Sequence, residues 1–333
     1  MYFTVIVPVY NRPDEVHDLL TSLAKQTYTK PYEVLIVEDG SKLDCKKEAK
    51  MFEDFLNISY YYKENSGPGD SRNYGMTRAK GDYFLILDSD CILPDNYLEE
   101  VEKSLEENPV DCFGGVDSAL DTFSHMQKAI NFAMTSVLTT GGVRGGSEKL
   151  GKFQPRSFNM GISRKAFEAS GGFGNIHPGE DPDLSIRLWK MGFETCLFGK
   201  VSVFHKRRIS WKNYYTQVSK FGKVRPILDR WHPGYFKITF LFPSLFILGM
   251  IASAYLAFSK ILRPLYAYLA YFLLCFIVAA TQNRSLRIGL MSLRAVFTQF
   301  FGYGTGYLLS FWKVIICRRK PEKAFPNLFF KKK

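Results

Sequence analysis

The run Tyr83–Asp90, YFLILDSD, carries the clearest structural pattern in this chain. It is a short apolar run without glycine or proline, and it ends in two aspartates one residue apart. An apolar run of this length is typical of a strand buried on both faces, as in a parallel sheet. Because side chains alternate along a strand, Asp88 and Asp90 are expected on one face, with Ser89 opposite.

Two carboxylates on one face at the end of a buried strand repel each other and lose hydration. A hard divalent cation such as Mg²⁺ or Mn²⁺ offsets both costs, often while sharing its coordination with a substrate phosphate. Open α/β sheets bind their ligands at this edge. The alternative is a solvated pair that caps the next turn, because Pro94 and Asp95 follow. The dipeptide pattern alone leaves both interpretations open.

Strands and helices alternate along the N-terminal half of the sequence. Apolar runs at Phe3–Tyr10, Glu33–Val37 and Ile58–Tyr62 are expected strands, each followed by a segment with helical features. This alternation predicts an α/β fold with a mostly parallel, Rossmann-like sheet, right-handed crossovers and flanking helices. Four strand ends therefore converge on one edge of the sheet, at Pro8–Arg12, Glu38–Ser41, Ser66–Arg72 and Asp88–Asp90.

The loop after the third strand, SGPGDSRN, has features of an anion site. Gly67 and Gly69 permit close backbone approach, and the N-terminus of the following helix favours anions. Arg72 can form a fork on a phosphate, and Asp39 can accept hydrogen bonds from a base or ribose. These features suit a nucleoside diphosphate. The spacing is not GxGxxG and no P-loop lysine is present, which argues against both of those nucleotide sites. An ordinary turn with a helix cap remains the alternative.

A second acidic cluster lies in the run Gly179–Leu184, GEDPDL. Pro182 fits the first position of a helix, which makes Asp181 the expected N-cap residue. Three carboxylates at this helix N-terminus, next to His177, also form a candidate cluster for a general base. Both interpretations remain open at this stage.

Three further segments carry weaker signals. A short strand is expected at Val201–His205, and its terminal histidine is either a structural residue or a ligand. Residues 95–130 are expected to be helical and polar. Residues 139–152 are rich in glycine and charge, which indicates a mobile loop that can cover the site.

The charge distribution points to a membrane partner. The formal net charge is +12, and the basic residues concentrate late in the chain, beside apolar segments. This arrangement favours anionic lipid headgroups over nucleic acid, for which no binding motif is present. The six cysteines show no CxxC spacing, which is typical of a reducing compartment. The N-terminus lacks a charged region before its apolar run, so no signal peptide is expected.

After residue 231 the composition becomes strongly apolar. Ile238–Phe258 and Leu265–Thr281 are candidate membrane spans. The stretch Ile288–Ile316 is interrupted by Arg294 and Gln299, so we expect two spans plus a third element that is re-entrant or lies in the plane of the membrane. The positive-inside rule then favours a cytosolic N-terminal domain. Hydrophobic core helices are the alternative.

Taken in their order along the chain, these motifs resemble those of the family 2 glycosyltransferases, which have the GT-A fold. The similarity covers roughly residues 3–225. Six motifs carry it: Val7–Asn11, Glu38–Ser41, Gly67–Asn73, Asp88–Asp90, Asn159–Gly161 with Gly171–Phe173, and Glu180–Leu184 with Arg187 and Leu188. The hydrophobic C-terminal region resembles that of membrane-associated bacterial members that build cell-surface glycans.

The resemblance implies an inverting, metal-dependent transfer of a sugar from a nucleotide-diphosphate sugar to a hydroxyl of a saccharide or lipid-linked acceptor. A UDP-sugar is expected in preference to a GDP-sugar. The implied contacts to the nucleotide-sugar come from Pro8, Tyr10, Asn11, Asp39, Gly67, Arg72 and Asp88. The implied ligands of Mn²⁺ or Mg²⁺ are Asp90 and His205. Asp181 is implied as the base beside Glu180, and Asn159 and Met160 are implied to lie toward the acceptor.

Processive members carry Gln-x-x-Arg-Trp after the base, whereas this chain has QVSKF at Gln217–Phe221, so transfer of single sugars is expected. A processive polysaccharide synthase is one alternative. A non-catalytic, membrane-tethered nucleotide-sugar-binding protein is an alternative of another class. The expected domains are a GT-A domain (1–230), membrane-associated helices (231–320) and a basic tail (321–333). The expected location is the cell (inner) membrane, with the catalytic domain cytosolic.

Overall fold

The computed structural model describes residues 1–118, 124–140, 153–205 and 210–330. The chain folds into two compact units: the first holds residues 1–120, 148–207 and 327–333, and the second holds residues 121–147 and 208–326. These limits differ from the predicted boundary at residue 230, because the helix α9 (Trp211–Trp231) belongs to the second unit. Most of the stretch expected as a mobile loop, residues 141–152, lies outside the described residues.

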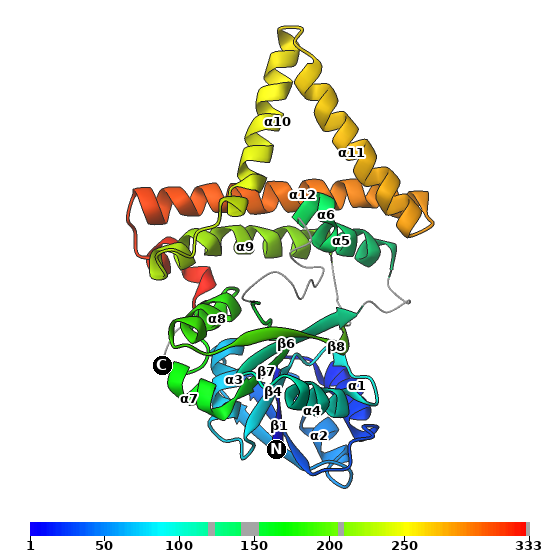
Figure 1. Ribbon diagram of the computed structural model, residues 1–333, viewed down its shortest axis with the longest axis vertical. Coiled ribbons are helices and arrows are strands. Elements are labelled where there is room, and N and C mark those ends of the chain that lie inside the picture. The colour runs from blue at the N-terminus through cyan, green and yellow to red at the C-terminus, as the bar shows by residue number, and fades with distance from the viewer. Residues whose placement is uncertain (119–123, 141–152, 206–209, 331–333) are drawn as a thin grey trace. The chain divides into compact units, whose positions relative to one another are not determined.

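The described part of the first unit is built on one eight-stranded sheet (Figure 1). Its spatial order is β3 (Ile58–Lys63), β2 (Tyr32–Asp39), β1 (Phe3–Val9), β4 (Tyr83–Leu87), β7 (Asn159–Ser163), β6 (Cys112–Ser118), β8 (Thr195–His205) and β5 (Cys91–Ile92). Strands β3, β2, β1 and β4 are parallel, as expected. Strand β7 is antiparallel to both β4 and β6, and β5 is antiparallel to β8. The α/β fold is therefore confirmed, but the sheet is mixed.

Strand β6 lies in the region expected to be helical, so that part of the prediction was wrong. The helix α4 (Tyr97–Glu107) accounts for the first half of the region. The sequence of β6, CFGGVDS, carries two glycines and ends in polar residues, so it shows no apolar strand pattern.

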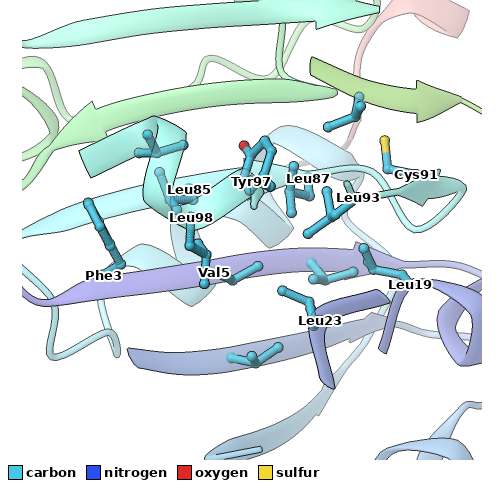
Figure 2. Close-up of a cluster of buried hydrophobic side chains, with 14 of the residues drawn as sticks. Phe3, Val5, Leu19, Leu23, Leu85, Leu87, Cys91, Leu93, Tyr97 and Leu98 are labelled. Atoms are coloured by element: carbon cyan, nitrogen blue, oxygen red, sulfur yellow. The ribbon is translucent and has the colours of Figure 1, made fainter. Parts of the chain in front are cut away.

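Two hydrophobic cores lie on the two faces of the sheet. On one face, helices α1 (Pro13–Ala24), α2 (Lys46–Met51) and α4 pack on Val5, Val7, Leu85 and Leu87, as Figure 2 shows in part. On the other face, α3 (Pro68–Met76), α7 (Arg164–Ser170) and α8 (Glu180–Lys190) pack on Ile6, Phe84 and Ile86. Burial of both faces explains why the central strands read as continuous apolar runs.

The second unit is helical in its described residues. Besides α9, it contains α5 (His125–Thr135), α6 (Val137–Thr140), η1 (Ile238–Phe240), α10 (Phe242–Phe258), α11 (Arg263–Gln282), α12 (Leu286–Ser310), the π-helical turn η2 (Phe311–Ile316) and α13 (Pro321–Ala324). A further short 3₁₀ turn, η3, spans Pro326–Leu328. Helix α12 runs without a break through most of the stretch Ile288–Ile316, where a third membrane-associated element is expected, and its placement in a membrane stays a prediction.

Helices α9 and α12 run side by side in the same direction (Figure 1). Tyr214 contacts Gln299 near the start of α9, and Arg230 donates to the Val314 carbonyl beyond the end of α12. The backbones of α9 and α12 approach closely because glycines lie at the contact. A side chain at Gly222 or Gly306 would collide with backbone atoms of the facing helix.

Helices α10 and α11 form a hairpin joined by a short loop at residues 259–262 (Figure 1). Their outer surfaces expose many large apolar side chains, among them Leu248, Ile251, Tyr255, Leu269, Leu273 and Ile277. Among the described helices, α11 is long and apolar enough to cross a membrane by length and composition, while α10 is apolar but shorter. Along α12, the exposed apolar residues Leu286, Leu290, Phe297, Phe301 and Leu308 recur at helical spacing.

Candidate active site

The carboxyl ends of β1, β2, β3 and β4 meet at one edge of the sheet, as the sequence predicts. Strand β4 ends at Leu87, so Asp88–Asp90 form a turn before β5 and are not part of the strand. The alternation argument for placing both carboxylates on one face was therefore wrong. Both residues are nevertheless partly exposed at the edge, where a ligand has access to them.

Asn11 braces two loops at this edge. It adopts a left-handed backbone conformation (φ +54°), which asparagine tolerates better than most residues. Its backbone amide donates to Ser41 Oγ at 2.7 Å, and its side-chain oxygen accepts from the Lys42 amide at 2.8 Å. Pro8 is buried within β1, whereas the neighbouring Tyr10 side chain is exposed. The predicted contacts of these residues with a nucleotide-sugar stay predictions.

Asp39 fixes the loop before α3. Its carboxylate accepts hydrogen bonds from the backbone amides of Ser66 and Gly67, both at 2.9 Å, and from Lys63 Nζ at 2.6 Å. Gly67 has φ +95°, a conformation that strains residues with a side chain. The buried carboxylate therefore shapes the loop expected to cradle a diphosphate. The contact of Lys63 with Asp39 could not be predicted from the sequence, because the two residues lie far apart in it.

Arg72, on α3, connects the two acidic motifs. Its guanidinium is almost fully buried and donates to Asp88 Oδ1 at 2.9 Å and to Glu180 Oε1 at 3.2 Å. It also lies over the Phe173 ring, 5.4 Å from the ring centre. The turn after β4 and the start of α8 are thus brought together by one cation. The predicted fork of Arg72 on a phosphate stays a prediction, since both of its terminal nitrogens have protein partners here.

Glu180 is shared between Arg72 and a histidine. His177 Nδ1 lies 2.8 Å from Glu180 Oε1. Burial by itself raises the pKa of Glu180, but the charges of His177 and Arg72 outweigh it and lower that pKa to about 2. For His177, burial acts to lower the pKa, and the Glu180 carboxylate more than reverses this effect, so the pKa is raised. The pair is therefore an ionised carboxylate next to a readily protonated imidazole.

Asp181 lies in the first turn of α8. The N-cap residue of this helix is Gly179, so the prediction of Asp181 as N-cap was wrong. Within the described residues, its Oδ1 is enclosed and has no hydrogen-bond partner. Burial, followed by the charge of Glu180, raises the pKa of Asp181 to about 7, although Arg72 and Ser157 act in the opposite direction. A carboxylate with this pKa can accept a proton near neutral pH.

Asn73 and Asp183, both in the sequence motifs, stabilise the turn Gly171–Phe173 through hydrogen bonds. Asn73 makes a reciprocal pair with Phe173, donating to its carbonyl at 2.9 Å and accepting from its amide at 2.8 Å. Asp183 accepts from Arg187 Nε at 3.0 Å, and Arg187 donates to the Gly172 carbonyl at 2.6 Å. These contacts hold the Gly171–Phe173 turn between α3 and α8, and long-range contacts of this kind leave no local sequence signal.

The two residues predicted to lie toward the acceptor are buried inside the first unit. Asn159 is fully buried in β7; its side-chain oxygen accepts from Tyr97 at 2.8 Å, and its nitrogen donates to the Val201 carbonyl at 3.2 Å. Met160 is buried in the core beneath α7 and α8. Neither side chain reaches the surface, so both serve the packing of the sheet. A buried asparagine and an acceptor-binding one look alike in sequence.

The residues predicted to bind a metal gather at the turn after β4. Strand pairing places the backbone of His205 opposite Cys91, next in sequence to Asp90. Asp88 and Asp90 offer carboxylate oxygens, the donors that Mg²⁺ and Mn²⁺ prefer. Among the described residues no group of three or more His, Cys, Asp or Glu side chains forms a ready-made metal site. The donor set therefore fits a cation that completes its coordination with oxygens of a bound diphosphate.

Comparison with known proteins identifies the family of this chain. Residues 4–171, just over half of the chain, match the family model described as Glycosyl transferase family 2. The chain therefore belongs to the family 2 glycosyltransferases.

Sequence relatives match only in part. An uncharacterized glycosyltransferase of Rickettsia bellii is 37% identical over 105 residues, which cover 32% of this chain and 15% of that protein. The poly(ribitol-phosphate) beta-N-acetylglucosaminyltransferase TarS of Staphylococcus aureus is 33% identical over 114 residues, or 33% of this chain and 20% of TarS. The matches thus span a minor part of these relatives' own length.

Among solved structures, the mannosyltransferase PcManGT of Pyrobaculum calidifontis, in complex with GDP-Man and Mn²⁺, is similar to this chain with a TM-score of 0.58. The similarity covers 93% of this chain and 87% of that one, at 18% sequence identity. At this identity the likeness shows the fold alone, which is GT-A-like.

The raised pKa of Asp181 predicts that folding stability depends on pH. Its carboxyl holds a proton more tightly in the folded chain than in the unfolded one, so its contribution to stability is lost as pH rises from about 4 to about 7. Asp181→Asn removes that penalty. We expect the melting temperature of the variant, relative to the parent, to increase between pH 4 and 7 and to stay level above it.

Thermal unfolding in a pH series measures this difference, with the exposed Asp54→Asn as a matched control. A melting-temperature difference between variant and parent that is the same at pH 5 and pH 8 would show that Asp181 has an ordinary pKa.

Proposed function

We propose that this protein transfers a single sugar, with inversion, from a nucleotide-diphosphate sugar to a hydroxyl of a saccharide or lipid-linked acceptor. One observation carries this proposal: the Arg72 guanidinium binds Asp88 and Glu180 at the same time. The acid expected to face the donor sugar and the turn that carries the expected base therefore share one site. Family membership supports the reaction type.

The reaction is one displacement at the anomeric carbon. Asp181 takes the proton of the acceptor hydroxyl as its oxygen bonds to that carbon, and the bond from the carbon to the diphosphate oxygen breaks on the opposite face. Its pKa of about 7 leaves a substantial fraction ionised at neutral pH. Arg72 and Glu180 hold the base turn in place, and Asp39 holds the loop that would cradle the diphosphate.

A divalent cation, Mn²⁺ or Mg²⁺, held by Asp90 with His205 as a further ligand, would neutralise charge on the leaving diphosphate. The Mn²⁺ in the PcManGT complex supports this assignment by analogy. The donor class is supported in the same way, since one relative is named an N-acetylglucosaminyltransferase and the other structure holds GDP-Man. A UDP-sugar stays our preferred donor.

The two alternatives differ from this proposal in what they need. A processive synthase would elongate a chain, which a product-length assay on a defined acceptor detects. A non-catalytic nucleotide-sugar-binding protein would need no base, yet Asp181 Oδ1 is enclosed without a hydrogen-bond partner among the described residues and the pKa of this carboxyl is raised, a costly arrangement that suits proton transfer.

The base assignment predicts the effect of Asp181→Asn. We expect turnover of the donor to fall by about 10²–10⁴-fold, because an amide accepts no proton, while nucleotide affinity is preserved. In the parent, the turnover rate should rise with pH through about 7 and then level off, as the carboxyl ionises. Release of nucleoside diphosphate measures the turnover of the variant and the pH dependence of turnover in the parent, with Asp54→Asn as control. Unchanged turnover in Asp181→Asn would remove the base from the proposal.

The metal assignment predicts the effect of Asp90→Ala. Loss of a carboxylate ligand should weaken the Mn²⁺-dependent part of UDP or GDP binding by about tenfold or more. Binding measured by calorimetry with Mn²⁺ and with EDTA isolates that part, and Asp54→Ala is the matched control. Equal metal-dependent affinity in parent and variant would refute the role of Asp90.

We further propose that the second unit attaches the protein to the cell membrane. The α10–α11 hairpin exposes apolar side chains on its outer surfaces, and α12 presents an apolar stripe at helical spacing. At about 1.5 Å per residue, the 20 residues of α11 span about 30 Å, which matches the apolar core of a bilayer. The hairpin would insert, α12 would lie in the plane, and the catalytic unit would stay in the cytosol.

This attachment predicts that Leu269→Lys with Leu273→Lys weakens membrane binding. Each lysine at the centre of an inserted helix costs about 2.5–3.5 kcal/mol, so the double variant should leave the vesicle fraction. Flotation with vesicles that contain anionic lipid measures the binding. Phe55→Lys, at a similarly exposed apolar position of the first unit, should float like the parent. Equal flotation of the double variant and the parent would contradict insertion of α11.

A further inference from the structure

The residues Asn327–Phe330 form a short segment, the C-terminal strap, that packs on the first unit. Phe329 forms an antiparallel bridge with Ile176. The His177 amide donates to the Leu328 carbonyl at 2.8 Å, and the Phe330 amide donates to the Asn175 carbonyl at 3.3 Å. The Leu328 side chain is fully buried. The strap therefore adds a strand-like edge to the loop Asn175–His177, just before α8.

Phe330 lies where the two halves of the candidate site meet. A side chain on Gly67 would collide with the Phe330 ring, so the ring packs directly on the glycine of the diphosphate loop. The same ring lies 6.2 Å from the imidazole of His177, with the ring planes 50° apart. The Phe330 ring thus contacts both the loop around Gly67, on the donor side of the site, and His177, on the side of the proposed base Asp181.

The contact between Phe330 and His177 is linked to the proposed base by a series of hydrogen bonds. His177 binds Glu180, and Glu180 binds Arg72 and precedes Asp181. A shift of the loop that carries His177 would move the charge of Glu180, which acts directly on Asp181. The donor side has its own anchors, because Asp39 binds the amides of Ser66 and Gly67. Loss of the strap should therefore disturb the base more than the nucleotide.

We propose that the C-terminal strap is a required part of the active site and that Phe330 is a positioning residue for the base turn. The proposal rests on the function proposed above and extends it to a segment outside residues 4–171, the part that the family model matches. Phe330 touches neither of the reacting groups assigned above. It acts through His177 and Glu180 by holding the loop before α8 in one conformation.

Phe330→Ala tests the proposal in the full chain, with and without substrate. Without substrate, we expect the His177 amide to exchange its hydrogen about tenfold faster, and the imidazole pKa, followed by NMR, to fall toward its ordinary value. The charged groups that act on this imidazole are Glu180, Arg72 and Asp181. With UDP-N-acetylglucosamine and GDP-mannose as probes, we expect kcat to fall about 10–100-fold, and the Kd of UDP or GDP with Mn²⁺ to change less than about twofold.

Two controls separate positioning from general damage. Phe330→Leu keeps an apolar side chain on Gly67 and should restore most of the rate and the His177 pKa. Replacement of Lys331, Lys332 and Lys333, which follow the strap in the sequence, by alanine should leave every readout unchanged.

The outcomes also separate this inference from the proposed function. If Phe330→Ala matches the parent in exchange, pKa and kcat while Asp181→Asn is inactive, the strap has no positioning role. If Phe330→Ala raises kcat, the strap obstructs the site and the inference is wrong. If Asp181→Asn keeps its activity, the proposed base itself fails, whatever the strap does.

Discussion

The buried guanidinium of Arg72 is the interaction on which the candidate site depends. Asp88 and Glu180 carry like charges and approach the same side chain at 2.9 and 3.2 Å, an arrangement that costs several kcal/mol without a cation between them. The guanidinium is always protonated and presents two donors in a fixed plane, so it can serve both carboxylates at once. Lysine, with a single point of charge, would hold one of them well.

The contacts of Arg72 with Glu180 give Glu180 and its neighbour Asp181 different protonation states. Glu180 receives Arg72 and His177 as partners and is ionised, whereas Asp181 has an enclosed oxygen with no partner among the described residues. The negative charge of Glu180 then adds to burial in raising the pKa of Asp181. Two adjacent carboxylates in one helical turn are thereby assigned different tasks, one structural and one suited to proton transfer.

Much of the fold could be predicted from the sequence because its signals are local. The run Tyr83–Leu87 is apolar throughout since both faces of its strand are buried, and the alternation of strands and helices indicates parallel order. Strand β6 was missed because its CFGGVDS sequence lacks an apolar pattern. The switch to antiparallel pairing at β7 also has no local signal.

The site was predicted in outline only. Glycine-rich loops and acidic pairs mark the ends of strands, so the position of Asp39 and Asp88 at one edge could be inferred. The partners of Arg72 could not, since they lie 16 and 108 residues away in the sequence. The same holds for Asn159, whose buried amide ties β7 to α4 and β8, and for the return of Phe330 to Gly67.

A double-mutant cycle between Asp88→Asn and Glu180→Gln, measured by the free energy of unfolding, tests whether Arg72 couples the two acidic motifs. If Arg72 joins the donor side to the base side, loss of one carboxylate changes what the other contributes, and the two effects should differ from additivity by about 0.5–3 kcal/mol. The coupling should vanish when the cycle is repeated in Arg72→Met. Effects that add within about 0.3 kcal/mol in the parent background would show that the two acids belong to separate sites.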